Sequence, residues 1–366
     1  MVFTAGDFPV QACFNHPAVI AQPPTHSPNK LGLETCHPYS FKIIKLVTMN
    51  IPLPTLSTIA MVLLLTSCGE HQSCKSHCNE SQAPWQQQTF SNGIGQEMIW
   101  IAPGSFRMGD SSGNGNQDEQ PAQVIELSGY HLASTEVTQK QWQQIMGASI
   151  LDQARKALRD NTQYPQLQGK RIREVLGMQS EDQADALIIG KGADHPIYWV
   201  SHAEALEFCL KLSIREWSEG RLPLNYQYSL PTEAQWEYAC RAGSEGGHAG
   251  KPDAIAWYAD NSSNLIHPVA KKAPNAWKLY DMHGNVNEWC LSWYADNYKA
   301  LDTLDPQGPA QDKAFITADE HGPFRVMRGG SSYSSEDQTR SSAKNAFDPR
   351  FRDDDFGFRV ALVPVK

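Results

Sequence analysis

The chain has 366 residues, of which 40% are hydrophobic and 19% are charged. This length and apolar content suffice for one large globular domain or for two small ones. The formal net charge is −9, and no long run of lysine or arginine occurs. Because proteins bind nucleic acids mainly through basic side chains that face the phosphates, this charge balance argues against a nucleic-acid partner.

The first 48 residues show no hydrophobic periodicity and contain scattered prolines. We interpret residues 1–48 as a doubtful N-terminal extension from an over-long gene model, because Met49 opens a plausible signal peptide. A start at Met49 leaves no basic residue before the apolar stretch, whereas a slightly earlier start would include Lys42 and Lys45. The position of the start codon therefore stays open.

A short apolar stretch at residues 59–65 runs directly into Leu65-Thr66-Ser67-Cys68. It is too short to cross a bilayer as a helix, but it has the length of a signal-peptide core. Its end resembles a bacterial lipobox, in which the cysteine thiol takes a diacylglycerol. We therefore predict a lipoprotein signal peptide at residues 49–67 and a lipid anchor at Cys68. This places the protein in the bacterial cell envelope, periplasmic or surface-exposed. The alternative is a chance buried segment with an inert cysteine.

The segment that follows, residues 68–96, is rich in glutamine, serine and asparagine and poor in aliphatic residues. Such a composition is typical of a polar tether between a membrane anchor and a folded domain. Cys74 and Cys78 lie in this tether, where a local disulfide and two inert thiols are equally compatible with an oxidising compartment. The globular part retains Cys209, Cys240 and Cys290.

The folded domain is expected to begin at Glu97. Residues 98–109 alternate apolar and polar side chains and end on glycine, which predicts a strand and a hairpin. Residues 123–127 predict a further strand.

Three helices are indicated by capping residues. Thr138, Ser201 and Thr232 each precede a glutamine or glutamate by three residues, which is the pattern of a capping box. Apolar residues follow each cap at spacings of three and four, so one face of each helix is expected to be buried. Cys209 and Cys240 fall on these faces. We interpret both as small hydrophobic core residues, with a nucleophilic role as the alternative.

Residues 148–192 form a charged segment with apolar residues at helical spacing, and we interpret it as a helical insertion. The second half of the chain is rich in tryptophan, tyrosine, glycine and asparagine, which indicates much irregular backbone held by aromatic packing.

Several segments, in the same order along residues 97–364, resemble the formylglycine-generating enzyme or sulfatase-modifying factor family. They are residues 101–109, 118–121, 135–138, 230–239, 279–289, 328–331 and 357–359. The resemblance implies an α+β protein with a C-type-lectin-like fold, made of short twisted sheets, helices and much irregular loop. It assigns residues 97–366 to this domain.

The family's catalytic cysteines are missing from this chain. In the family, an Arg-Gly-Gly-Ser segment is followed by two cysteines, five positions apart, which bind copper and oxidise a substrate cysteine. Here Arg328-Gly329-Gly330-Ser331 is followed by Ser332 to Thr339 without a cysteine. Cu(I) is a soft ion that needs thiolates, and serine or threonine hydroxyls do not replace them at neutral pH. The sequence therefore argues against copper and against formylglycine generation, and whether another enzymatic activity remains stays open.

The stretch from Asp281 to Glu288 resembles the family's calcium loop. The resemblance implies side-chain oxygens from Asp281 and Glu288 and carbonyl oxygens from Gly284 and Val286. Calcium takes six to eight hard oxygen ligands in irregular geometry, which suits such a set. The alternative is that Asp281 caps a turn and Glu288 pairs with an arginine.

Aromatic, small polar and acidic residues crowd the interval between Ser331 and Gly357. Side chains of these kinds on a rigid scaffold are typical of ligand-binding surfaces. The family's fold also hosts recognition domains, some diversified in this interval. We therefore keep a binding or display module for an unknown protein or small ligand, and a structural envelope lipoprotein, as alternatives. Its possible ligand surface comprises Tyr333, Ser335, Asp337, Phe347, Phe351, Asp353 and Asp354.

Overall fold

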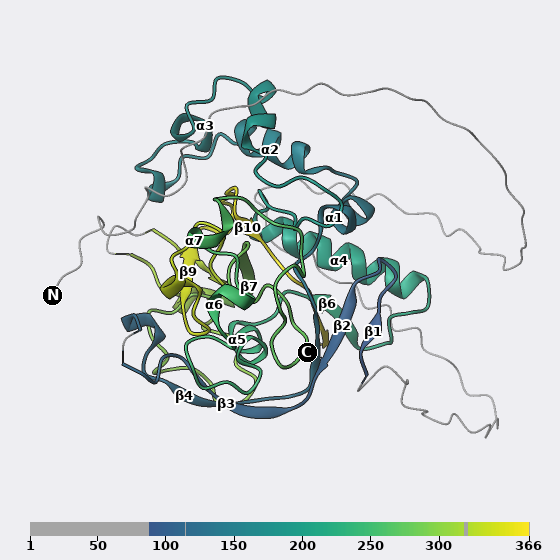
Figure 1. Ribbon diagram of the computed structural model, residues 1–366, viewed down its shortest axis with the longest axis vertical. Coiled ribbons are helices and arrows are strands. Elements are labelled where there is room, and N and C mark those ends of the chain that lie inside the picture. The colour runs from purple at the N-terminus through teal and green to yellow at the C-terminus, as the bar shows by residue number, and fades with distance from the viewer. Residues whose placement is uncertain (1–87, 114, 318–320, 366) are drawn as a thin grey trace, which may run out of the picture. The chain divides into compact units, whose positions relative to one another are not determined.

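The computed structural model describes residues 88–113, 115–317 and 321–365. The predicted extension, signal peptide and lipid anchor at Cys68, together with Cys74 and Cys78, lie outside these residues. In the described part, helices and short strands alternate with long irregular segments (Figure 1). The predicted α+β class is thereby confirmed. No described helix combines the length and the apolar character that a membrane crossing requires.

The described strands form three sheets. The largest has the order β1-β2-β5-β11-β6, and its neighbours are antiparallel. Its strands are β1 (Phe90–Ser91), β2 (Glu97–Ile101), β5 (Tyr130–Ala133), β11 (Ala361–Pro364) and β6 (Tyr226–Ser229). The second sheet has the order β10-β7-β8-β9. Its strands are β10 (Phe356–Gly357), β7 (Asn287–Trp293), β8 (Arg325–Arg328) and β9 (Lys344–Phe347). The third sheet pairs β3 (Gly104–Met108) with β4 (Gln123–Leu127).

The chain returns at its C-terminal end to complete two of these sheets. β11 lies between β5 and β6, and β10 pairs in parallel with β7. The loop between β9 and β10 is therefore fixed at both ends by sheet pairing. The strand expected at residues 123–127 is confirmed as β4. The strand and hairpin expected at residues 98–109 become β2 and β3, which enter different sheets.

The three predicted capping boxes are confirmed. The caps Thr138, Ser201 and Thr232 each accept a hydrogen bond from the backbone N–H three residues later, which satisfies a donor that the helix itself leaves free. The helices they begin are α1 (Gln139–Met146), α4 (His202–Ser218) and α5 (Glu233–Arg241). Trp142 of α1 stacks on Phe208 of α4 at 5.7 Å between ring centroids, and Phe358 packs edge-on against Phe208 at 5.3 Å. This aromatic contact joins both helices to the end of the chain.

Residues 148–192 are mainly helical. They contain α2 (Ile150–Arg159), α3 (Ile172–Val175) and a 3-10 helix at Glu181–Leu187. Ile150, Ala154 and Leu158 are buried in the same core as Phe208. The segment is thus packed into the domain. Two further short helices, α6 (Pro252–Ile255) and α7 (Ala259–Ser262), precede β7.

The folded body begins before Glu97. β1 pairs with β2, and the Asn92 carboxamide oxygen accepts hydrogen bonds from the backbone N–H groups of Ile94 and Gln96. Asn92 and Gln96 are buried. The predicted tether therefore ends before residue 96. Its polar composition did not distinguish a flexible tether from this local turn, which the Asn92 side chain holds.

Candidate functional site

The segment after Ser331 is a compact turn followed by a 3-10 helix at Glu336–Thr339. The Ser334 hydroxyl accepts a hydrogen bond from the backbone N–H of Ser331 at 3.0 Å. The Thr339 hydroxyl donates to the Glu336 carbonyl at 2.7 Å. Both hydroxyls therefore hold the backbone of the segment.

The cysteines of the described region lie elsewhere and are buried and free: Cys209, Cys240 and Cys290. Cys240 Sγ lies 3.5 Å from Nε2 of His283, a distance that would suit a nucleophile and its base. Burial raises the pKa of the Cys240 thiol to about 12 and lowers the pKa of His283 to about 4. The thiol therefore stays protonated at neutral pH. The structural interpretation of Cys209 and Cys240 fits these surroundings.

His283 is held in one tautomer beneath the Ser331 segment. Its Nδ1 lies 2.7 Å from the Thr339 carbonyl oxygen, which only accepts, so Nδ1 carries the proton. Its Nε2 then accepts from the backbone N–H of Ala249 at 3.3 Å. A neutral imidazole thus links the loop before β7 to the segment that carries copper cysteines in active relatives.

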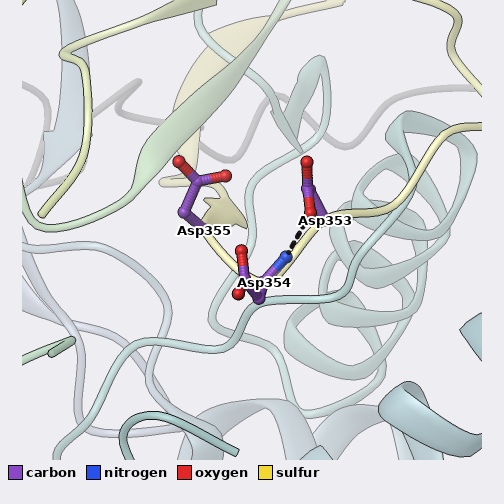
Figure 2. Close-up of side chains that lie close together, drawn as sticks. All are labelled: Asp353, Asp354 and Asp355. Carbon is purple, nitrogen blue, oxygen red and sulfur yellow. Dashed lines mark hydrogen bonds between the residues drawn. The ribbon is translucent and has the colours of Figure 1, made fainter. Parts of the chain in front are cut away.

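Three consecutive carboxylates gather at the turn between β9 and β10. Asp353, Asp354 and Asp355 each place a carboxylate oxygen within 4.8 Å of the others (Figure 2). The backbone N–H of Asp354 donates to Asp353 at 3.0 Å (Figure 2). Asp354 and Asp355 are each 7% exposed. The run is therefore folded inward, which excludes the solvated turn that charge runs usually form.

Residues of the Ser331 segment and β7 surround this acidic cluster. Tyr333 donates its hydroxyl to Asp354 Oδ2 at 3.5 Å, and Asn287 donates its side-chain N–H to Asp355 Oδ2 at 3.0 Å. The Ser331 side chain also hydrogen-bonds Asp355. Asp354 Oδ1 is buried without a hydrogen-bond partner. The cluster thus lies directly against the segment where the family places its catalytic cysteines.

The charge of the acidic cluster is not balanced by the described part of the chain. Among the described residues, no lysine, arginine or histidine forms a salt bridge with Asp353, Asp354 or Asp355. Neighbouring Arg352 pairs with Asp160 and Glu204. Burial, reinforced by the charge of Asp355, raises the pKa of Asp353 to about 8. Burial and its two neighbours raise the pKa of Asp354 well above the usual value. Such groups either take protons or meet a cation from outside.

The predicted ligand surface is only partly assembled. Tyr333, Asp353 and Asp354 come together, as described above. Ser335 is exposed at the N-cap of the 3-10 helix, and Asp337 is exposed within that helix, where it pairs with Arg340. Phe347 is half-buried and stacks on Phe351.

The assignment of Phe351 to the ligand surface was wrong. Its side chain is 4% exposed and packs edge-on against Tyr164 at 4.9 Å between ring centroids. The helical insertion that carries Tyr164 covers this ring, so Phe351 belongs to the core.

The side chains of the predicted calcium ligands Asp281 and Glu288 are buried, and most of their oxygens accept hydrogen bonds from the protein. Glu288 accepts two hydrogen bonds from the Arg359 guanidinium, both at 2.6 Å, and one from the Trp236 indole at 2.7 Å. Asp281 accepts through Oδ2 from the backbone N–H of Ala270 at 2.7 Å, while Oδ1 is buried without a partner. The arginine pairing that the sequence left as an alternative is thus present at Glu288.

The turn between these two carboxylates is tightly packed. Gly284 has φ +84°, and a Cβ added there would lie 1.9 Å from the Trp257 carbonyl oxygen. Only glycine fits this contact and this backbone conformation without strain. The glycine therefore fixes how closely the loop approaches Trp257.

Glu136, which was not predicted as a site residue from the sequence, lies beside Asp281. Its Oε1 accepts from the Asn285 side chain at 3.1 Å, and its Oε2 is buried without a partner. Burial and the charges of Asp281 and Glu288 raise the pKa of Glu136 well above the usual value, and burial raises that of Asp281 to about 6. The side chains of Glu136 and Asp281 lie within hydrogen-bond reach of each other, so they either share a proton or hold a hard divalent cation between their otherwise unpartnered oxygens. The only sequence feature that could have pointed to Glu136 was its position in the family motif at residues 135–138.

Several known proteins are similar to this chain in sequence. Residues 85–363 match the model of the sulfatase-modifying factor enzyme 1-like domain. The formylglycine-generating enzyme of Streptomyces coelicolor is 26% identical over 304 residues, which cover 72% of this chain and 88% of that protein. The serine/threonine-protein kinase pkn1 of Chlamydia pneumoniae is 30% identical over 275 residues, covering 72% of this chain. The chain spans only 38% of that protein's length.

The fold has relatives among solved structures. Treponema denticola variable protein 1 superimposes with a TM-score of 0.55 and 26% identity, and the match covers 75% of this chain and 98% of that one. PvdO from Pseudomonas aeruginosa superimposes with a TM-score of 0.57 and 22% identity, covering 76% of this chain and 98% of that one. The fold expected from the sequence resemblance is confirmed.

Proposed function

Because the chain belongs to the sulfatase-modifying factor enzyme 1-like domain family, we propose that it is a member that does not generate formylglycine. The observation that carries this proposal is the chemistry of residues 331–339. The segment contains no thiol, and the hydroxyls of Ser334 and Thr339 are engaged in holding its backbone. Cu(I) requires soft ligands, and these hydroxyls are hard and stay protonated. Copper-dependent oxidation has no ligand pair here.

In place of that chemistry, the domain acts as a binding module. Asp353 and Asp354, with Tyr333 beside them, form the centre of the proposed ligand surface, and Asp354 Oδ1 is free to accept a hydrogen bond. A ligand that presents a primary amine or a guanidinium would balance the buried negative charge and donate the missing bonds.

Binding at this surface is tested with immobilised peptides that contain lysine or arginine, with acetyl-lysine peptides as the uncharged comparison. Asp354→Asn should weaken binding of the charged peptides about tenfold or more, because it removes a charge-assisted hydrogen bond. Asp302→Asn, a change at an exposed aspartate, is the matched control. Equal binding of charged and acetylated peptides by the wild type would reject a cationic ligand.

Calcium is proposed as a stabilising ion near Asp281. The unpartnered oxygens of Asp281 and Glu136 support it, and the family resemblance adds the carbonyl oxygens of Gly284 and Val286. Glu288 is paired with Arg359, so it would join the ion only by sharing its carboxylate. The ion would lock the loop before β7 and take no part in chemistry.

The domain is proposed to be held in the bacterial cell envelope by a lipid on Cys68. The sequence Leu65-Thr66-Ser67-Cys68 supports this anchor. Cys68→Ser should leave an unprocessed precursor or move the protein from the detergent phase to the aqueous phase in phase partitioning. An unchanged partition, with an N-terminus upstream of residue 68, would reject the anchor.

A further inference from the structure

One face of α4 carries an exposed apolar stripe. Leu210, Ile214 and Trp217 follow one another at spacings of four and three, so their side chains line up on one side of the helix. They are 56%, 58% and 59% exposed. The opposite face of α4 buries Ala205, Phe208, Cys209 and Leu212 in the core. One face of α4 is therefore buried in the core, while a second apolar face is exposed to solvent. This exposed face, made of Leu210, Ile214 and Trp217, is called the α4 stripe.

The α4 stripe concentrates the apolar exposure of the molecule. Four of the nine large hydrophobic residues that are exposed in the described part of the chain lie at residues 210–224. Three belong to the α4 stripe, and Leu224 lies in the loop beyond the end of α4 at Ser218. Single exposed hydrophobic residues are ordinary, whereas a contiguous group marks an interaction surface.

The described chain begins beside the C-terminal end of this helix. The backbone N–H of Gly93 donates to Glu216 Oε2 at 3.2 Å, and a shallow hollow there is lined by Phe90, Asn92, Glu216 and Arg221. Figure 1 shows β1 lying near the end of α4. The segment that leads back to Cys68 thus joins the domain at the C-terminal end of α4, where the buried Glu216 holds Gly93.

The length of that segment limits how far the domain stands from the anchor. Nineteen residues lie between Cys68 and Gln88, and the chain from one to the other spans at most about 70 Å. A domain tethered so closely meets the bilayer at a high effective concentration, so a small apolar surface suffices for contact.

The chemistry of the stripe and its flank fits a lipid surface. Tryptophan favours the headgroup level of a bilayer, and leucine and isoleucine favour the acyl boundary. Lys211 and Arg215 lie along one side of the stripe and pair with Glu207 and Glu219. The formal charge of the protein is −9, but these pairs leave the side of α4 beside the stripe near neutral. Acidic residues there therefore do not repel an anionic membrane surface.

We infer that the α4 stripe rests on the membrane that carries the lipid anchor and sets the orientation of the domain; this inference depends on the anchoring proposed at Cys68. With Leu210, Ile214 and Trp217 at the headgroup level, α4 lies along the membrane surface.

Quenching of Trp217 by brominated lipids tests this orientation. The lipidated full-length protein is reconstituted into vesicles of phosphatidylethanolamine and phosphatidylglycerol, with or without bromine at a shallow acyl position. Trp217 is the one exposed tryptophan among the described residues, and its signal is the difference between the wild type and Trp217→Phe. We expect the brominated vesicles to remove most of that difference signal. Leu210→Gln with Ile214→Gln should restore it, whereas Leu304→Gln, at a residue that is 65% exposed, should not.

Mass spectrometry of the N-terminus separates the two proposals. A lipidated protein whose Trp217 signal is unquenched overturns the orientation and leaves the anchor intact. A protein without lipid at Cys68 overturns the anchor and the orientation with it. An unquenched Trp217, with a dimer that the Leu210→Gln and Ile214→Gln variant converts to a monomer, assigns the stripe to a second copy and also overturns the inference.

Discussion

Two groups of carboxylates, all buried except the half-buried Asp353, differ in whether the chain supplies a cation. Glu288, with Glu136 and Asp281 nearby, faces Arg359, which holds it with a bidentate ion pair. Asp353 to Asp355 meet no such group among the described residues. A buried charge persists when it is paired, protonated or bound to a ligand. The first group is therefore neutralised within the fold, while the second depends on a proton or a ligand.

The largest effect is expected when Arg359, the arginine that pairs with Glu288, is replaced. Arg359→Met leaves Glu288 buried and unpaired, which should lower the free energy of unfolding by about 3–5 kcal/mol. Arg350→Met, which breaks the exposed pair with Asp348, should cost at most about 1 kcal/mol. Urea unfolding of both variants measures the difference. Equal losses would show that Arg359 does not neutralise the first group.

Calcium is expected to raise the melting temperature through the first group of carboxylates. An ion that binds only the folded state adds about 2.7 kcal/mol at a hundredfold excess over its dissociation constant. Chelation should therefore lower the melting temperature of the wild type, and Asp281→Ala or Glu288→Ala should remove most of that dependence. Glu136→Gln should act in the same direction. Identical wild-type melting curves with calcium and with chelator would leave Arg359 as the sole cation of this group.

A smaller effect is expected from the pH dependence of the acidic cluster. The pKa of Asp353 is about 8 in the folded protein against 3.8 in an unperturbed carboxyl, so between these values the folded state keeps a proton that the unfolded state has lost. Its contribution to stability is therefore complete below about pH 4 and is lost as the pH rises through 8. Asp353→Asn, which stays neutral, should stabilise the protein by about 1 kcal/mol or more at pH 8 relative to pH 5. Thermal unfolding across this range, with Asp302→Asn as control, checks the sign. A variant that gains nothing at pH 8 would show that burial and the charge of Asp355 do not raise the pKa of Asp353 in the folded protein.

Features that depend on neighbouring residues were predictable from the sequence. The capping boxes at Thr138, Ser201 and Thr232 need only a side chain and a backbone N–H three residues apart, so their pattern is visible in the chain. The missing thiols after Ser331 are equally local, because the segment is a single stretch.

Features that depend on long-range packing were not predictable. Glu136 accepts a hydrogen bond from Asn285, which lies 149 residues later in the chain, and no sequence spacing predicts such a contact. Phe351 lies in a charged stretch, yet Tyr164 of the insertion covers it. The acidic run at residues 353–355 turns inward because β9 and β10 fix both ends of its loop, which is a property of the sheet.

The central claim is that the family's oxidative chemistry is absent, and aldehyde formation tests it most directly. The purified protein is supplied with Cu(I), oxygen and a Cys-x-Pro-x-Arg peptide, beside the Streptomyces coelicolor formylglycine-generating enzyme as positive control. Mass spectrometry should find formylglycine only in the control, because residues 331–339 offer no thiolate pair. Conversion of the peptide by the wild-type chain at a rate comparable to the control would contradict the account.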